Sequence, residues 1–170
     1  MKLIIDIITF KQIKFVFISL IFFATTVASN AQSVKMRGKP SSIISTFAIV
    51  PEGKTLTFTS GLTASALDSS LEDGDYAKYG DTKTQALSIL DKFKILLSEE
   101  GLDLGQAFSM KVYVSKDPLK GIFDFKGWNE AYKIYFGTTE NPNKPVRATV
   151  GIAELVNPNK FIEIELILAN

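Results

Sequence analysis

The 170-residue sequence contains no cysteine and no histidine. Their absence excludes disulfide bonds, thiolate nucleophiles, Ser-His-Asp and Cys-His catalytic groups, and the usual ligand sets for zinc. An excess of charge of one sign is also lacking, because 19 basic residues face 18 acidic ones. The composition therefore gives no support for a nucleic-acid partner. Any chemistry must come from Arg, Lys, Asp, Glu, Tyr, Ser or Thr side chains or from the backbone.

The first 31 residues have the layout of a secretory signal peptide. Three lysines precede an apolar run over residues 15–28, and Ser29-Asn30-Ala31 supplies small residues for cleavage after Ala31. A retained membrane anchor is the alternative, but the run is shorter than the roughly 20 residues that a spanning helix needs. We therefore expect residues 1–31 to be removed and residues 32–170 to form one domain. The mature protein would be periplasmic or secreted, with no membrane association.

The spacing of apolar residues predicts five strands and two helices. Strands are expected at residues 43–50, 55–60, 107–115, 143–155 and 161–168. The first two would form an antiparallel pair, and the last two a hairpin around a turn rich in Asn and Pro. Helices are expected at residues 82–100 and 125–136, with Asp81 and Asp124 as caps and Gly101 and Gly137 as stops. This order predicts a two-layer α+β fold, a mixed β-sheet with both helices on one face.

One face of such a sheet has no cover within a single chain. Phe58, Met110, Phe161 and Ile167 are candidates to lie on that face and to pack against another subunit. An oligomer is thus an expectation from the layer count.

Three further segments complete the prediction. Residues 32–42 are predicted to be a lead-in without a strand, and residues 62–80 to be a long loop that is either a functional lid or a passive connection. The second helix carries an aromatic face that is predicted to be core rather than a ligand cage. This face consists of Phe125, Trp128, Tyr132, Tyr135 and Phe136.

Arg147 is the leading candidate for a binding residue. A guanidinium binds carboxylates bidentately and keeps its charge at any working pH. Thr149 lies on the same face of the strand, and Glu163 on what we expect to be the neighbouring strand could exchange a proton with water. The alternative is a surface ion pair of Arg147 with Glu163 or Glu165. No phosphate loop, metal motif or cofactor fingerprint is present, so no cofactor and no metal are predicted.

Residues 144–150 (KPVRATV) followed by residues 161–167 (FIEIELI) resemble the C-terminal hallmark of the YjgF/RidA family of imine deaminases. That hallmark is a Pro-x-Arg-x-x-Val element and a closing Ile-Glu-Ile-Glu strand. Ser60-Gly61 resembles the family's Ser-Gly, and residues 128–136 resemble its Val-Asn-x-x-Tyr-x-x-Phe helix. The resemblance extends over about residues 45–169.

The resemblance implies a chorismate-mutase-like fold and a homotrimer with active sites at subunit interfaces. It also implies hydrolysis of small 2-imino acids and enamines, such as 2-iminopropanoate and 2-aminoacrylate, to 2-oxo acid and ammonia without a cofactor. Arg147 would clamp the substrate carboxylate, and Glu163 would position or protonate water and the imine. Ser60, Gly61 and Thr149 would complete the pocket.

The sequence departs from the family pattern at several positions. Phe47 stands where the family carries a pocket tyrosine, so the ring remains and the hydroxyl is lost. Leu62 replaces a glutamine, and Thr149 stands where many deaminases carry cysteine. Asn129 is expected to be structural or to contact the substrate-binding residues without touching the substrate itself.

Two functions follow as alternatives. The first is an imine deaminase. The second is a non-catalytic trimer of the same fold that binds small carboxylates. Ribonuclease activity, sometimes attributed to this family, is a weaker third option because the charge is near neutral.

Overall fold

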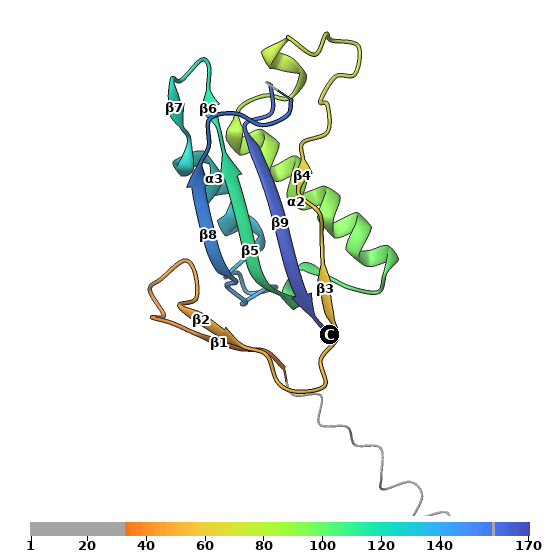
Figure 1. Ribbon diagram of the computed structural model, residues 1–170, viewed down its shortest axis with the longest axis vertical. Helices are drawn as coiled ribbons and strands as arrows, with labels where there is room; N and C mark the ends of the chain where they lie inside the picture. Colours follow the sequence, from red (N-terminus) through yellow and green to blue (C-terminus); the bar gives the residue numbers. More distant parts are fainter. Residues whose placement is uncertain (1–32, 158) are drawn as a thin grey trace, which may run out of the picture. The chain divides into compact units, whose positions relative to one another are not determined.

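Two eight-residue strands, β5 (Ala107–Val114) and β9 (Ile162–Ala169), form the centre of the structure (Figure 1). They run antiparallel. Two short strands, β3 (Leu56–Phe58) and β4 (Leu62–Thr63), pair antiparallel with β9, while β8 (Val146–Gly151) pairs parallel with β5. The path through the sheet is β3–β9–β5–β8, so the sheet is mixed, as predicted.

The computed structural model describes residues 33–157 and 159–170. The predicted signal peptide and its cleavage site lie outside these residues, so the periplasmic or secreted location stays a prediction. Over the residues described, we find no helix with both the length and the apolar character that crossing a membrane requires.

Two helices, α2 (Thr82–Glu99) and α3 (Phe125–Tyr135), cover one face of this sheet (Figure 1). The carboxylates of Asp81 and Asp124 accept hydrogen bonds from backbone N–H groups in the first turns, which confirms both predicted caps. The two-layer α+β fold predicted from the sequence is therefore confirmed. Two short 3₁₀ helices complete the helical segments, η1 (Tyr76–Lys78) and η2 (Leu104–Gln106).

The core lies between the sheet and the helices. Alternate residues of β9, beginning at Ile162, are buried toward the helices, which leaves Glu163 and Glu165 on the open face. Met110 and Phe161 are each 1% exposed, so the prediction that they lie on the open face is wrong. Met110 shares the helix-facing side of β5, and Phe161 precedes β9 and packs beside Tyr76.

The open face keeps the other predicted apolar residues. Phe58 is 68% exposed and Ile167 is half-buried. Leu56 and Val150 are exposed in addition. Exposed apolar side chains at both ends of one sheet face are typical of a surface that another molecule covers.

The first predicted strand pair is wrong. Strand β2 (Phe47–Ile49) pairs with β1 (Lys35–Arg37), which lies in the segment predicted to be a lead-in. Strand β3 joins β9 instead of β2. A turn signal in the sequence shows where the chain bends, but it does not identify the pairing partner, and here the turn carries the chain from one sheet to another.

The predicted C-terminal hairpin is also wrong. Strands β8 and β9 both pair with β5 and are separated by it (Figure 1). Parallel strands need a crossover connection, and α3 supplies it between β5 and β8. The segment between β8 and β9 is consequently a long connection across the end of the sheet rather than a tight turn.

The segment from residue 64 to residue 80 is tied to its surroundings. Tyr76 donates a hydrogen bond to Asp117 over 2.8 Å, and Leu67 donates its N–H to the carbonyl of Lys78. Asp117 belongs to a small antiparallel pair, β6 (Lys116–Asp117) with β7 (Ile122–Phe123). These contacts anchor the segment against the end of the sheet.

Candidate functional site

Arg147 lies on the helix-facing side of the edge strand β8. It stands opposite the buried Met110 in the parallel register with β5, so both side chains point to the same face. Its guanidinium carbon is 4.6 Å from the ring centre of Tyr132 and 5.3 Å from that of Trp128. Its Nη2 donates a 2.7 Å hydrogen bond to Oδ1 of Asn129. Three residues of α3 thus hold one guanidinium.

The charge of Arg147 is not neutralised by a carboxylate. Among residues 33–157 and 159–170, no Asp or Glu lies within ion-pair distance of it. Burial lowers the pKa of Arg147 from its ordinary value and the nearby Tyr132 opposes that shift, but a guanidinium remains protonated in proteins. Burial also raises the pKa of Tyr132 to about 12, so its hydroxyl is a neutral donor. The predicted alternative, a pair with Glu163 or Glu165, is wrong.

Buried polar atoms without hydrogen-bond partners gather around this guanidinium. They belong to the described part of the chain, and four of the five lie on α3 and β8. These four are Trp128 Nε1, Tyr132 Oη, Arg147 Nη1 and Thr149 Oγ1. A buried donor without a partner costs about 1–3 kcal/mol, so native proteins normally satisfy it. Arg147 and Thr149 therefore present donors suited to an anionic ligand.

Glu163 occupies a different place. It lies opposite Tyr113 of β5 and Thr63 of β4 on the open face of the sheet. Gly61 packs directly against its carboxylate, since a Cβ atom built on Gly61 would lie 1.9 Å from Oε1 of Glu163. Of the other residues predicted to complete the pocket, Gly61 lies against Glu163 and Ser60 is exposed.

One chain does not bring Arg147 and Glu163 together. They lie on opposite faces of the sheet, and β5 separates their strands. The expectation that they occupy neighbouring strands is wrong, because β5 lies between β8 and β9. Phe47, 54% exposed on β2, belongs to neither cluster within one chain.

A hollow of about 630 Å³ lies between residues 42–46 and strands β5 and β8. The residues that line it include Arg147, Ser45, Ser109 and Lys111. The segment over it is held by Lys144, whose ammonium donates to the carbonyls of Pro40 and Ser42. This hollow places open space beside the strand that carries the guanidinium.

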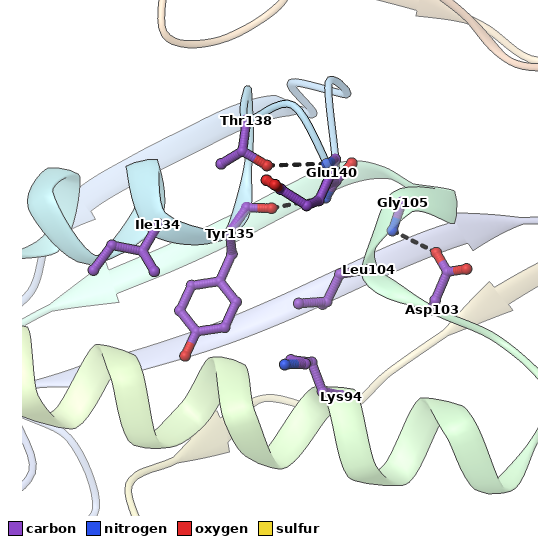
Figure 2. Close-up of a pocket in the computed structure, with 9 residues that line it drawn as sticks. Lys94, Asp103, Leu104, Gly105, Ile134, Tyr135, Thr138 and Glu140 are labelled. Atoms are coloured by element: carbon purple, nitrogen blue, oxygen red, sulfur yellow. Dashed lines mark hydrogen bonds between the residues drawn. The ribbon is translucent and has the colours of Figure 1, made fainter.

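A second hollow, of about 370 Å³, lies between the C-terminal parts of α2 and α3 and the 3₁₀ helix η2 (Figure 2). Its polar groups serve local structure: Asp103 accepts from the N–H of Gly105, and Thr138 accepts from that of Asn141. It contains none of the predicted site residues. No group of three or more Asp or Glu residues suited to a metal ion occurs in the described part of the chain.

Comparison with known proteins agrees with this architecture, a two-layer α+β domain with a buried arginine on an edge strand. A family model described as Endoribonuclease L-PSP matches residues 44–170. The chain therefore belongs to this family, the YjgF/RidA family, and the resemblance found in the sequence is confirmed.

Individual relatives are moderately similar. A RutC family protein of Pyrococcus abyssi is 34% identical over 96 residues, which cover 56% of this chain and 67% of the relative. The structure of the YjgF gene product of E. coli has 29% identity and a TM-score of 0.52, covering 71% of this chain and 84% of that one. The structure of E. coli TdcF with bound serine has 25% identity and a TM-score of 0.53, covering 80% and 98%.

Sequence reasoning identified Arg147, Thr149 and Asn129 but missed their support. The aromatic face of α3 was predicted to be core. Trp128, Tyr132 and Phe136 are indeed buried and Tyr135 is half-buried, but the prediction is wrong for Phe125, which is exposed at the start of the helix. Two of these rings also contact the guanidinium. The four-residue spacing of Trp128 and Tyr132 beside Asn129 was the available signal, since residues at that spacing share one helix face.

Proposed function

We propose that this protein hydrolyses small 2-imino acids to 2-oxo acids and ammonia, and that it does so as a homotrimer with shared active sites. The observation that carries the proposal is the guanidinium of Arg147, which is buried, charged and without a carboxylate partner among the described residues. Such a group is suited to a small anionic substrate. The bound serine in the similar TdcF structure supports a ligand of that size.

In this proposal Nη1 of Arg147 and the hydroxyl of Thr149 bind the substrate carboxylate. Both are buried donors without partners in the described structure. Asn129 fixes the other end of the guanidinium through Nη2, so that Nη1 keeps one direction. The donors therefore require no rearrangement when the carboxylate arrives, which reduces the entropic cost of binding.

Glu163 supplies the proton transfers. Its carboxylate takes a proton from water as the water oxygen attacks the carbon of the protonated imine, which gives a neutral carbinolamine. It then passes that proton to the amino group. As the C–N bond breaks and ammonia leaves, the carboxylate takes the proton of the carbinolamine hydroxyl, whose oxygen becomes the carbonyl of the 2-oxo acid, and this proton ends on ammonia as ammonium. Gly61 leaves room for this carboxylate because any larger residue would collide with it.

A second copy of the chain is needed to bring Glu163 to Arg147, because the two lie on opposite faces in one copy. The exposed Phe58, Leu56 and Val150 on the open face support association through that face. Phe47, exposed on β2, would then add its ring to the pocket of a neighbouring copy.

Complementation between inactive variants tests both parts of the proposal. Imines are generated in the assay by an amino acid oxidase, and release of ammonia and 2-oxo acid is measured. Arg147→Met and Glu163→Gln should each retain about one tenth of the wild-type activity or less when assayed alone. Mixed at equal amounts and refolded together, they should recover about one quarter of the wild-type activity if each site takes one residue from each of two neighbours in a trimer. Absence of any recovery in mixed oligomers would refute the shared site.

A non-catalytic carboxylate-binding trimer is the second candidate, favoured by one observation. Phe47 lacks the hydroxyl that the family's tyrosine would bring to the pocket. Calorimetric binding of 2-oxobutanoate by a wild-type protein that releases no ammonia from imines would establish this alternative. The family model's description as an endoribonuclease suggests RNA cleavage, but the net charge of +1 gives little attraction for a phosphate backbone.

A further inference from the structure

Arg147 is held by aromatic rings where a counter-ion would be expected. Tyr132 and Trp128 lie 4.6 Å and 5.3 Å from its guanidinium carbon, and both are almost completely buried. The rings are fixed in turn, because Tyr132 stacks on Phe136 with centroids 4.9 Å apart and meets Trp128 edge-on at 5.6 Å. Trp128 and Tyr132 are four residues apart on α3 and so share one helix face, and Phe136 follows as the C-cap residue of that helix.

This arrangement stabilises a buried cation without neutralising its charge or occupying its hydrogen-bond donors. A carboxylate partner would neutralise the guanidinium and occupy the donors that a substrate needs. The face of an aromatic ring attracts the cation through its quadrupole and accepts none of the in-plane N–H groups. Because a guanidinium is planar, it also stacks on a ring in a way that an ammonium does not.

We propose that Trp128 and Tyr132 are positioning residues, which hold the guanidinium of Arg147 in a fixed plane and leave its Nη1 edge directed at the substrate carboxylate. The inference rests on the proposed function for the identity of the ligand, and it adds two residues that do not touch the substrate. The role belongs to the ring faces, so the hydroxyl of Tyr132 is dispensable and the ring is not.

The chain offers its own reporter, since Trp128 is its only tryptophan. A carboxylate that binds Arg147 changes the electrostatic environment of that indole, and the intrinsic fluorescence should change on titration with 2-oxobutanoate. The titration curve should disappear in Arg147→Met. Lys126→Met, which removes an exposed cation from the same helix, should leave the curve unchanged.

The decisive comparison is between two substitutions of one residue. Tyr132→Phe keeps the ring and should bind 2-oxobutanoate within about twofold of the wild type, whereas Tyr132→Leu should bind about tenfold more weakly. In turnover assays the leucine variant should raise KM and leave kcat nearly unchanged, because it weakens ground-state and transition-state binding alike. Wild-type affinity in a folded Tyr132→Leu protein, checked by thermal melting, would overturn the proposal.

A second measurement covers the case in which Tyr132→Leu fails to fold. The side-chain N–H resonances of Arg147, assigned by their loss in Arg147→Met, should be shifted upfield by the ring currents in the wild type and in Tyr132→Phe. Resonances at the positions of solvent-exposed arginines in both proteins would overturn the proposal. Neither result depends on catalysis: a wild type that binds 2-oxobutanoate and releases no ammonia would refute the deaminase function and leave this inference standing.

Discussion

The polar residues on the two faces of the sheet have different surroundings. On the helix face, Arg147 is enclosed by Tyr132, Trp128 and Asn129, with buried donors left over. On the open face, Glu163 lies half-buried over Gly61. The donors proposed to bind an anion thus lie within one chain, while the carboxylate proposed for proton transfer lies on the face that we propose a second chain covers.

The two glutamates on the open face differ in whether other side chains of the same chain bind their carboxylates. Glu165 accepts a 3.1 Å hydrogen bond from Tyr113 and pairs with Lys111 at 3.3 Å. Glu163, two residues earlier on the same face, has no ion-pair partner in the described part of the chain. The two glutamates are adjacent in the motif, yet only one is engaged by its own chain, and this gives each experiment on Glu163 a matched control.

The largest expected effect is that of Glu163→Gln. If this carboxylate transfers protons, its replacement should lower kcat about 10²–10⁴-fold, while 2-oxobutanoate binding changes little. Glu165→Gln should lower kcat by less than about threefold, because an exposed ion pair contributes little. Equal losses for the two variants would show that the open face acts through its overall charge and not through one residue.

Arg147→Met should have the next largest effect. Removal of a charge-assisted bond to the substrate should reduce kcat/KM about 10–100-fold. Stability should not fall, because the substitution removes a buried charge that lacks a counter-ion. Thermal melting together with turnover checks both parts. A large drop in melting temperature would mean that Arg147 is a structural residue, and the contrast between the two faces would lose its basis.

Gly61→Ala tests the contact under Glu163. The added Cβ would meet the carboxylate at 1.9 Å, so the side chain or the strand must shift. We expect a loss of about 1–3 kcal/mol in the free energy of unfolding, measured by urea denaturation, together with a lower kcat. Gly74→Ala is the control, since nothing lies within 4 Å of its added Cβ and its φ is not positive. Equal stability of the two variants would contradict the close packing.

Local features of the fold could be predicted from the sequence, and its long-range pairing could not. The caps Asp81 and Asp124 and the helices after them follow from short-range patterns and are confirmed. The insertion of β5 between β8 and β9 depends on contacts between segments more than 30 residues apart. The alternation of apolar and polar residues indicates where a strand lies and which of its residues share a face, but it does not identify the neighbouring strand.

The candidate site shows the same division. Arg147 and Thr149 were predicted to share a face because they are two residues apart on one strand, and each is half-buried with one fully buried polar atom. Glu163 was placed beside them because the sequence suggested a hairpin. The contacts of the Trp128 and Tyr132 rings with the guanidinium could not be predicted. Whether Arg147 faces α3 or the opposite side of the sheet depends on the register of β8 with β5, which the sequence pattern does not reveal.

The smallest expected effect concerns the helix layer that carries the aromatic rings. Lys120 bridges the caps of α2 and α3, with its ammonium 3.0 Å from Asp81 and 2.6 Å from Asp124. Burial acts to raise the pKa of each carboxyl, but hydrogen bonds from Lys120 and from the backbone outweigh it, so both pKa values are lowered. Their stabilisation is therefore complete above the ordinary aspartate pKa of about 4 and is lost as the pH falls through the lowered values.

Lys120→Met should consequently reduce the free energy of unfolding by about 1 kcal/mol at neutral pH, a modest loss because solvent screens a partly exposed ammonium. The difference from the wild type should shrink as the pH falls below about 4 and through the lowered pKa values of the two carboxyls. Urea denaturation at several pH values measures it, with the exposed Lys39→Met as control. A difference that is constant with pH would show that Lys120 acts through packing and not through the two caps. Such a result would contradict the electrostatic link between the N-termini of α2 and α3. It would not affect the interpretation of the aromatic contacts of Arg147.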